Sequence, residues 1–179
     1  MTHSPPHGIA GLSAIVVMGV SGSGKTTIAK MMASRLALPF RDADSFHPPA
    51  NIAKMSAGQP LNDADRAPWL AAIAAWIGGF RREHACCVVT CSALKRSYRE
   101  AIRAGHDDVL IVYLKGDMTL IHDRMAARKH HFMPLELLAS QFATLEEPAP
   151  DEYALVVSID ATPTVITERA LEGLRARTP

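Results

Sequence analysis

Residues 19–26 constrain the fold of this chain more than any other stretch. They read Gly-Val-Ser-Gly-Ser-Gly-Lys-Thr, which fits the pattern G-x-x-x-x-G-K-[ST] of a phosphate-binding P-loop. The apolar, β-branched run at residues 14–18 predicts a buried parallel strand before the loop, and the apolar spacing in residues 26–36 predicts a helix after it. Strand, loop and helix in this order are the context that the pattern requires. The sequence therefore predicts a nucleotide site rather than a Gly/Ser-rich turn that matches by chance.

The chemistry of phosphate binding explains the residue types in this loop. Glycines let backbone N–H groups close around phosphate oxygens, and the N-terminus of the following helix adds partial positive charge. Lys25 is expected to reach the β- and γ-phosphates, and the Thr26 hydroxyl is expected to bind Mg²⁺. The predicted nucleotide-binding residues of this segment are Gly19, Val20, Ser21, Gly22, Ser23, Gly24, Lys25, Thr26 and Thr27.

The composition limits the partners of the chain. The formal net charge of the 179 residues is +1 and no basic run is present, so neither nucleic acid nor an acidic membrane surface is expected as a partner. Cys86, Cys87 and Cys91 lie in or next to one apolar strand, which indicates reduced, buried thiols rather than disulfides. The first residues lack the pattern of a signal peptide, and no apolar run is long enough to cross a bilayer. We expect a single-domain cytoplasmic protein whose residues 1–12 form a flexible tail.

The rest of the chain alternates between strand and helix patterns. Further strands are expected at residues 38–41, 85–90, 109–114 and 155–159, and further helices at 51–57, 65–80, 96–104, 117–128, 134–145 and 164–175. This alternation predicts an α/β fold, in which a five-stranded parallel sheet lies between two layers of helices. Ligands of such sheets bind beyond the carboxyl ends of the strands. That rule selects residues 42–44, 91–95 and 115–117.

Two carboxylates follow the second expected strand. Asp42 and Asp44 are two residues apart, so they are expected to point in roughly the same direction. Near a nucleotide and Mg²⁺, Asp42 could bind the metal through water while Asp44 orients an attacking hydroxyl as a catalytic residue. The alternative is a solvated turn, because Asp is common in turns. The position at a strand end favours a functional role.

Two arginines lie on one face of the helix expected at residues 117–128. Arg124 and Arg128 are four residues apart and lead into a short loop. Transfer of a γ-phosphoryl group depends on charge neutralisation and on exclusion of water, so arginines on a lid would serve it as catalytic groups. Arg124 is also expected to contact the nucleotide. The alternative is a solvated helix face.

Several cations and one hydroxyl follow the second and third expected strands. Cations around a small pocket suit an anionic, hydroxyl-rich acceptor. Each residue taken alone is more typical of a surface, and only the shared region favours a site. The predicted acceptor-binding residues are Asp44, His47, Lys54, Arg66, Ser92, Lys95 and Arg99. Trp69 and Trp76 lie seven residues apart on one helix face, which indicates core positions.

Longer stretches of the sequence resemble the gluconokinases, small P-loop sugar-acid kinases related to shikimate and adenylate kinases. The resemblance rests on residues 19–26, 42–48, 51–55, 58–70, 91–95, 98–99, 113–116, 124–132 and 141–148, within a similar region from 14 to 160. The P-loop is generic, whereas Pro-Leu-Asn-Asp-x-Asp-Arg at 60–66 and Cys-Ser-Ala-Leu-Lys at 91–95 are specific to this family. The extended N-terminal tail is the clearest departure from the family.

The resemblance implies ATP-dependent phosphorylation of D-gluconate to 6-phospho-D-gluconate with Mg²⁺, often by a homodimer. It also implies a helical substrate-binding insertion at about residues 45–80 and a mobile lid at about residues 124–135 of a P-loop kinase fold. By similarity, Asp160 and Pro163 after the last strand form part of the adenine pocket. The choice of gluconate comes from the resemblance alone.

Two other functions stay open on the sequence. A different small hydroxy acid, such as shikimate, would keep every role and change only the acceptor pocket. A regulatory P-loop NTPase would hydrolyse nucleotide slowly and respond to a protein partner. The absence of a guanine-reading Asn-Lys-x-Asp stretch and the presence of an acceptor-sized insertion count against this second function.

Overall fold

The computed structural model describes residues 9–126 and 135–177. It contains a five-stranded, all-parallel sheet with the strand order β2-β3-β1-β4-β5. The strands are β1 (Ala14–Met18), β2 (Phe40–Asp42), β3 (Cys87–Thr90), β4 (Val109–Lys115) and β5 (Leu155–Ser158). The helices are α1 (Lys25–Leu36), α2 (Pro49–Ser56), α3 (Asp63–Arg82), α4 (Arg96–Arg103), α5 (Met118–Ala126), α6 (Leu135–Thr144) and α7 (Pro163–Arg175). The predicted α/β fold of a P-loop kinase is confirmed.

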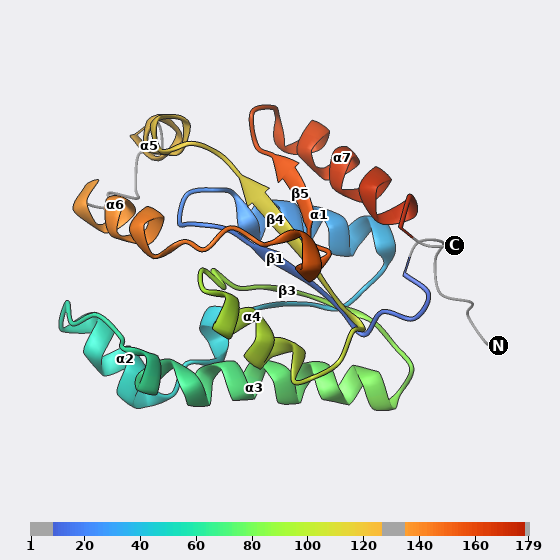
Figure 1. The fold of residues 1–179 in the computed structure, drawn as a ribbon, viewed down its shortest axis with the longest axis horizontal. Helices are drawn as coiled ribbons and strands as arrows, with labels where there is room; N and C mark the ends of the chain where they lie inside the picture. Colours follow the sequence, from blue (N-terminus) through green and yellow to red (C-terminus); the bar gives the residue numbers. More distant parts are fainter. Residues whose placement is uncertain (1–8, 127–134, 178–179) are drawn as a thin grey trace.

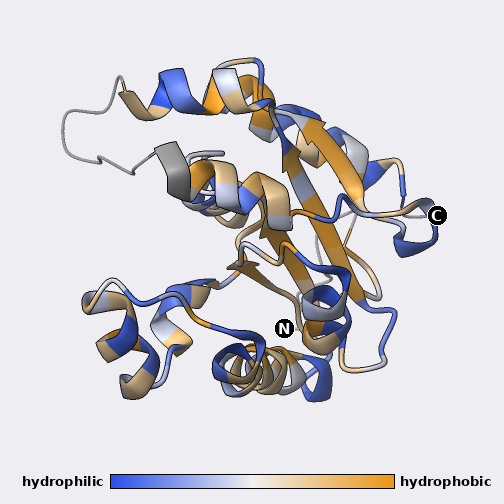
Figure 2. Ribbon diagram, turned by 60° about the vertical axis from the view of Figure 1, so that its left-hand side comes forward, coloured by the Kyte–Doolittle hydropathy of each residue, from blue (hydrophilic) through white to orange (hydrophobic). Residues whose placement is uncertain are grey.

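Helices cover both faces of the sheet, with α1 and α7 on one side and α3 and α4 on the other (Figure 1). Every residue of β1 is buried, because this central strand has a helical layer on each face. Ile15 and Val17 join the core under α1 and α7, while Ala14, Val16 and Met18 join the core under α3 and α4. The three inner strands β1, β3 and β4 are correspondingly apolar along most of their length (Figure 2). β1 is thus held between two separate cores, and this fixes the position at which the P-loop begins.

The carboxyl end of the second strand differs from the prediction. β2 is only three residues long, and the chain turns at Ala43 into a short 3-10 helix, η1 (Ala43–Phe46). Asp44 therefore lies on this helix rather than on a strand, and strand alternation with Asp42 is the wrong reason to place the two carboxylates together. Asp42 caps η1, since its Oδ1 accepts a hydrogen bond from the Asp44 N–H at 3.1 Å. The sequence Asp-Ala-Asp builds a capped turn at the mouth of the crevice.

Several smaller predictions can be compared with the structure. Cys86, Cys87 and Cys91 are free and buried, as predicted. Trp69 is buried as expected, whereas Trp76 is only partly buried and packs against the rings of Phe46 and Phe80. Part of the predicted flexible tail is folded: Ile9 is buried in the core, and its carbonyl accepts a hydrogen bond from Leu12 N–H. No helix within the described residues is long and apolar enough to span a membrane.

Candidate active site

The P-loop joins β1 to α1 at the carboxyl edge of the sheet. Gly24, which caps α1, has a positive φ of 90°, a conformation that glycine adopts without strain. The first turn of α1 contains no acidic residue, so nothing in it offsets the partial positive charge of the helix N-terminus. A glycine-rich loop that runs into a helix N-terminus is a favourable place for a phosphate group. The geometry agrees with the role predicted for residues 19–27.

The far side of the P-loop packs closely against α5. A Cβ atom on Gly22 would lie 2.6 Å from Met125 Sδ, and the φ of Gly22 is +81°. A side chain there would have to push the Met125 side chain aside and would be strained by the positive φ. The loop is thus held between its own strand and the helix that carries Arg124.

Lys25 lies in the middle of a small group of charges. Its Nζ donates a hydrogen bond to the carbonyl of Val20 at 2.9 Å. Burial lowers the pKa of Lys25 to about 8, and the carboxylates of Asp44 and Asp42 oppose that shift. The Cys91 thiol also faces Lys25, but burial raises its own pKa to about 12, so it is uncharged at neutral pH. Both predicted carboxylates therefore act electrostatically on the predicted phosphate-binding lysine.

The donor set for a magnesium ion lies beside this lysine. The Thr26 hydroxyl donates to Asp42 Oδ2 at 3.1 Å, which brings together the two residues predicted to serve the metal. Magnesium in phosphoryl-transfer sites is held through one or two carboxylates, a hydroxyl and the substrate phosphates. Thr26 and Asp42 fit that requirement.

The insertion that follows β2 carries the predicted acceptor side of the site. His47 stacks on Trp69, with ring centroids 4.3 Å apart and an interplanar angle of 11°. Trp69 is itself fixed, because its Nε1 donates to the carbonyl of Ala43 at 2.7 Å. Burial lowers the pKa of His47, so the imidazole is neutral at physiological pH and is suited to hydrogen bonding rather than to charge pairing.

The predicted acceptor lysines both form ion pairs with the start of α3. Lys54 Nζ lies 2.6 Å from Asp65 Oδ1, and Lys95 Nζ lies 2.9 Å from Asp63 Oδ2. These pairs are partly exposed to solvent, and pairs of that kind are weak. The two lysines can therefore exchange these partners for an anionic ligand.

Other acceptor-side residues surround these pairs. The Tyr98 hydroxyl shares Asp63 with Lys95, at 2.5 Å from Oδ1. Among the described residues Arg66 forms no ion pair, and its guanidinium lies 5.6 Å from the centre of the Tyr98 ring. Ser92 is half-buried and lies two residues after the end of β3. Arg66, Lys95 and Tyr98 thus form one cationic, hydrogen-bonding wall.

Arg99 does not belong to the acceptor site, and its prediction is wrong. Its side chain is 1% exposed and forms a two-pronged pair with Glu152, at 2.6 and 2.8 Å. Its Nη1 donates to the carbonyls of Ala93 and Glu146, both at 3.0 Å. These bonds point the guanidinium into the protein, where it fastens the segment before β5 to α4.

Hydrogen bonds to the loop after β5 hold the side chain of Arg124, so it is not a free surface side chain. Its Nη2 donates to the carbonyls of Ile159 and Ala161, at 2.5 and 2.9 Å. Arg124 thus adjoins the segment with Asp160 and Pro163, the residues expected near adenine, and both of these are exposed. The lid is predicted at about residues 124–135, and most of it, residues 127–134 with Arg128, lies outside the described residues.

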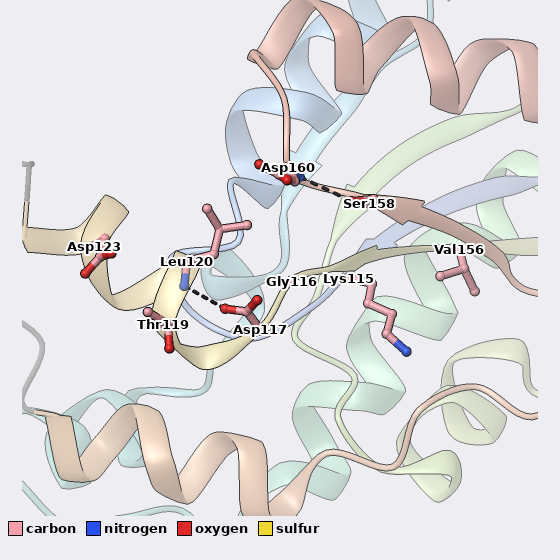
Figure 3. A pocket seen from close by; sticks show the side chains of 9 residues that line it. All are labelled: Lys115, Gly116, Asp117, Thr119, Leu120, Asp123, Val156, Ser158 and Asp160. Atoms are coloured by element: carbon pink, nitrogen blue, oxygen red, sulfur yellow. Dashed lines mark hydrogen bonds between the residues drawn. The ribbon is translucent and has the colours of Figure 1, made fainter.

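A separate cavity of about 790 Å³ opens beside this segment, at the ends of β4 and β5 (Figure 3). Its lining includes three carboxylates, from Asp117, Asp123 and Asp160, and one cation, Lys115. Lys115 is paired with Glu147 at 2.7 Å, so the cavity has no free positive charge to offer. The cavity is suited to the nucleoside end of a ligand and not to its phosphates.

Sequence reasoning missed four polar residues of the site. Three of them, Asp63, Asp65 and Gln141, form hydrogen bonds with the predicted residues Lys95, Lys54 and Ser21 respectively. The fourth, Tyr98, places its ring 5.6 Å from the predicted Arg66. A signal existed for one of them, because Asn62 and Asp65 form a capping box that fixes the start of α3. The others depend on contacts between elements far apart in the sequence, which no local pattern reveals.

Comparison with known proteins agrees with this geometry. The sequence profile of the family described as Shikimate kinase matches residues 21–174. The chain is 48% identical to a gluconokinase of Gluconobacter oxydans over 90% of its own length and 91% of the relative's. It is 44% identical to the thermoresistant gluconokinase of Escherichia coli, over 91% and 89% of the two chains.

The chain belongs to the gluconokinase family. The crystal structure of a gluconokinase from Sinorhizobium meliloti superposes with a TM-score of 0.84 at 42% identity, covering 92% of this chain and 93% of the other. The match thus includes the insertion and the P-loop together. As a gluconokinase-family member the chain is a P-loop kinase.

Proposed function

We propose that the protein transfers the γ-phosphoryl group of ATP to D-gluconate and so forms 6-phospho-D-gluconate. The observation that supports the proposal is the group of residues around Lys25: Asp42 and Asp44 both act electrostatically on it, and Asp42 accepts a hydrogen bond from Thr26. A cationic wall from α3 and α4 lies beyond it, and its residues suit an acceptor that is an acid with several hydroxyls. The names of the relatives supply the acceptor identity.

Residues 19–27 would bind the phosphates of ATP through backbone N–H groups and through Lys25. Thr26 would hold Mg²⁺ directly and Asp42 would hold it through water, and the ion supplies neutralisation of phosphate charge. Arg124, fixed to the carbonyls of Ile159 and Ala161, would border the nucleoside together with Asp160 and Pro163. Arg128 would add charge from the lid.

Asp44 would orient the acceptor hydroxyl and accept its proton. A primary hydroxyl is a poor nucleophile at neutral pH, and a loose transition state mainly needs the hydroxyl to be aligned and its proton accepted late. Asp44 is exposed at the mouth of the crevice and close enough to Lys25 to influence its pKa, so it can reach the group that receives the phosphate.

The charges at the acceptor end would bind the carboxylate of gluconate. Lys95 and Lys54 would exchange Asp63 and Asp65 for the ligand carboxylate, while Arg66 adds a cation without an ion pair among the described residues. His47 and Ser92 would bind hydroxyl groups, because a neutral imidazole and a hydroxyl can each donate and accept hydrogen bonds.

The decisive experiment measures ADP release with a panel of acceptors. Gluconate should stimulate turnover, whereas shikimate and glucose should stimulate it little, because shikimate has a different shape and glucose lacks the carboxylate. Product analysis should find a phosphomonoester on the primary hydroxyl. Equal turnover with and without any acceptor would indicate a regulatory NTPase and would contradict the proposal.

Two variants separate the roles of the carboxylates. Asp44→Asn keeps the shape and one acceptor oxygen but loses the charge, so gluconate phosphorylation should fall about 10²-fold or more while ATP affinity is nearly unchanged. Asp42→Asn should instead raise the Mg²⁺ concentration needed for half-maximal turnover. Loss of ATP binding in Asp44→Asn would contradict this division.

The assembly and the location of the protein are also proposals. A homodimer in the cytoplasm would agree with the family resemblance and with the reduced cysteines. Light scattering coupled to size-exclusion chromatography would test the dimer.

A further inference from the structure

Helix α6 reaches the P-loop through one side chain, Gln141. Its Oε1 accepts a hydrogen bond from the Ser21 backbone N–H at 2.7 Å, and its Nε2 donates to Ser21 Oγ at 3.2 Å. Gln141 is half-buried and is 120 positions away from Ser21 in the sequence. Residues 141–148 are part of the family resemblance, but neither the residue type nor the spacing there predicts a role for Gln141.

The two bonds fix the direction of the Ser21 hydroxyl. A backbone N–H can only donate, so the atom that faces it must be the amide oxygen of Gln141. The amide nitrogen then faces Ser21 Oγ and has only hydrogens to offer, so Oγ must accept. The hydroxyl hydrogen of Ser21 is consequently not used by Gln141 and is free to donate to another acceptor.

The C-terminal end of α6 is anchored, so Gln141 is held in place. Glu146, just beyond the helix, donates its N–H to the carbonyl of Leu94 at 2.8 Å. Its side-chain Oε2 accepts the N–H of Arg96 at 2.7 Å, and its carbonyl accepts from Arg99. The contact of Gln141 with the P-loop therefore has a rigid support in α4.

We infer that Gln141 is a positioning residue for the bound nucleotide. It holds the P-loop at Ser21 and sets the Ser21 hydroxyl as a donor to a phosphate oxygen. This inference rests on the proposed use of ATP but not on the choice of gluconate. Holding the loop before binding lowers the ordering cost that the ligand would otherwise meet.

Isothermal titration of ATP, without any acceptor, tests the inference. Gln141→Ala should raise the Kd for ATP about three- to tenfold, the loss expected for one or two hydrogen bonds, while Tm changes little because Gln141 is half-buried. Gln141→Glu should raise it about tenfold or more. The carboxylate would still accept from Ser21 N–H, but it would also accept the Ser21 hydroxyl hydrogen and place a negative charge beside the phosphates.

A double-mutant cycle and a matched control complete the test. Ser21→Ala should weaken ATP binding, and adding Gln141→Ala to it should cost less than in the parent chain, because both changes remove one interaction. Thr144→Val is the control on the same helix, since Thr144 Oγ1 donates only within α6, to the Ser140 carbonyl at 2.9 Å. Its Kd for ATP should match that of the parent.

The opposite results would overturn the inference. Tighter ATP binding by Gln141→Ala would mean that the amide competes with phosphate for the Ser21 N–H. An unchanged Kd in both Gln141 variants would mean that the contact is structural only. Failure of the wild-type protein to phosphorylate gluconate, with normal ATP binding, would overturn the proposed acceptor and leave this inference standing.

Discussion

At the P-loop end of the site the groups predicted to bind the ligand are backbone N–H donors and one lysine. At the predicted acceptor end they include Lys54 of α2 and Lys95 before α4, which are paired with carboxylates at the start of α3. The buried strand β1 holds the start of the P-loop, and Met125 of α5 packs against Gly22 within it. The acceptor cations are instead held by Asp63 and Asp65, in pairs that water can reach. The P-loop end is thus preformed, whereas the ion pairs at the acceptor end can be exchanged for contacts with a ligand.

The difference follows from what each end must recognise. Phosphate is the same in every nucleotide, so a rigid nest of N–H groups serves it without any particular side chain. An acceptor must be distinguished from similar acids, and that requires side chains whose charges and hydroxyls match one ligand. The carboxylates of Asp63 and Asp65 occupy positions on Lys95 and Lys54 that a ligand carboxylate could take.

The largest expected effect tests whether Arg99 belongs to the acceptor end at all. Arg99→Ala leaves Glu152 as an unpaired buried carboxylate, 4% exposed, and should lower the free energy of unfolding by about 3–5 kcal/mol. Arg96→Ala removes neighbouring but exposed pairs with Asp151 and Glu100 and should change the free energy of unfolding far less. Urea denaturation of both variants measures the contrast. A stable Arg99→Ala protein with a raised KM for gluconate would return Arg99 to the acceptor end.

The second effect tests the single side chain on which the P-loop end depends. Lys25→Ala should reduce turnover about 10²-fold or more, the scale of one lost transition-state donor, while the fold is retained. Lys30→Ala, on the exposed face of α1, is the matched control and should keep its turnover. Circular dichroism measures whether both variants are folded, and steady-state kinetics measures their turnover. Near-normal turnover of a folded Lys25→Ala protein would contradict the assignment of residues 19–26 as a phosphate-binding P-loop.

The third effect concerns the exchangeable end. Lys95→Ala should raise the KM for gluconate about tenfold and leave the KM for ATP unchanged, because one charge-assisted contact to the acceptor is lost. The Tm should change little, since the pair of Lys95 with Asp63 is exposed. Lys115→Ala is the control, because Lys115 pairs with Glu147 away from the acceptor wall. Equal changes in both KM values would contradict the separation of the two ends.

The same contrast explains which parts could be predicted from the sequence. The five strands, the P-loop and the proximity of Asp42 and Thr26 follow from local patterns, because apolar runs and a loop between strand and helix determine them. Lys95 and Arg99 lie within one turn of each other and both look like surface cations, yet one is 32% and the other 1% exposed. Their directions depend on Asp63 and Glu152, which are far away in the sequence. Gln141 was missed for the same reason.

The smallest effect concerns the charge of Lys25 before ATP arrives. Burial holds the pKa of Lys25 at about 8 in the free protein, below its usual 10.5, and only the protonated form is suited to phosphate. Bound phosphates favour the ammonium and raise this pKa. At pH 8 roughly half of the lysines are therefore unprotonated, so ATP binding should take up about half a proton, and affinity should fall as the pH rises further.

Titration calorimetry at pH 8 in two buffers with different ionisation enthalpies measures this uptake directly. At pH 6.5 the uptake at Lys25 should vanish, since the lysine is already protonated there. His47 does not contribute at pH 8, because burial lowers its pKa from 6.5. Lys25→Ala should lose the uptake at pH 8 even where it still binds ATP. A wild-type protein with no uptake at pH 8 would mean that Lys25 is fully charged in the free state, and the P-loop end would then be preformed in its charge as well as in its backbone.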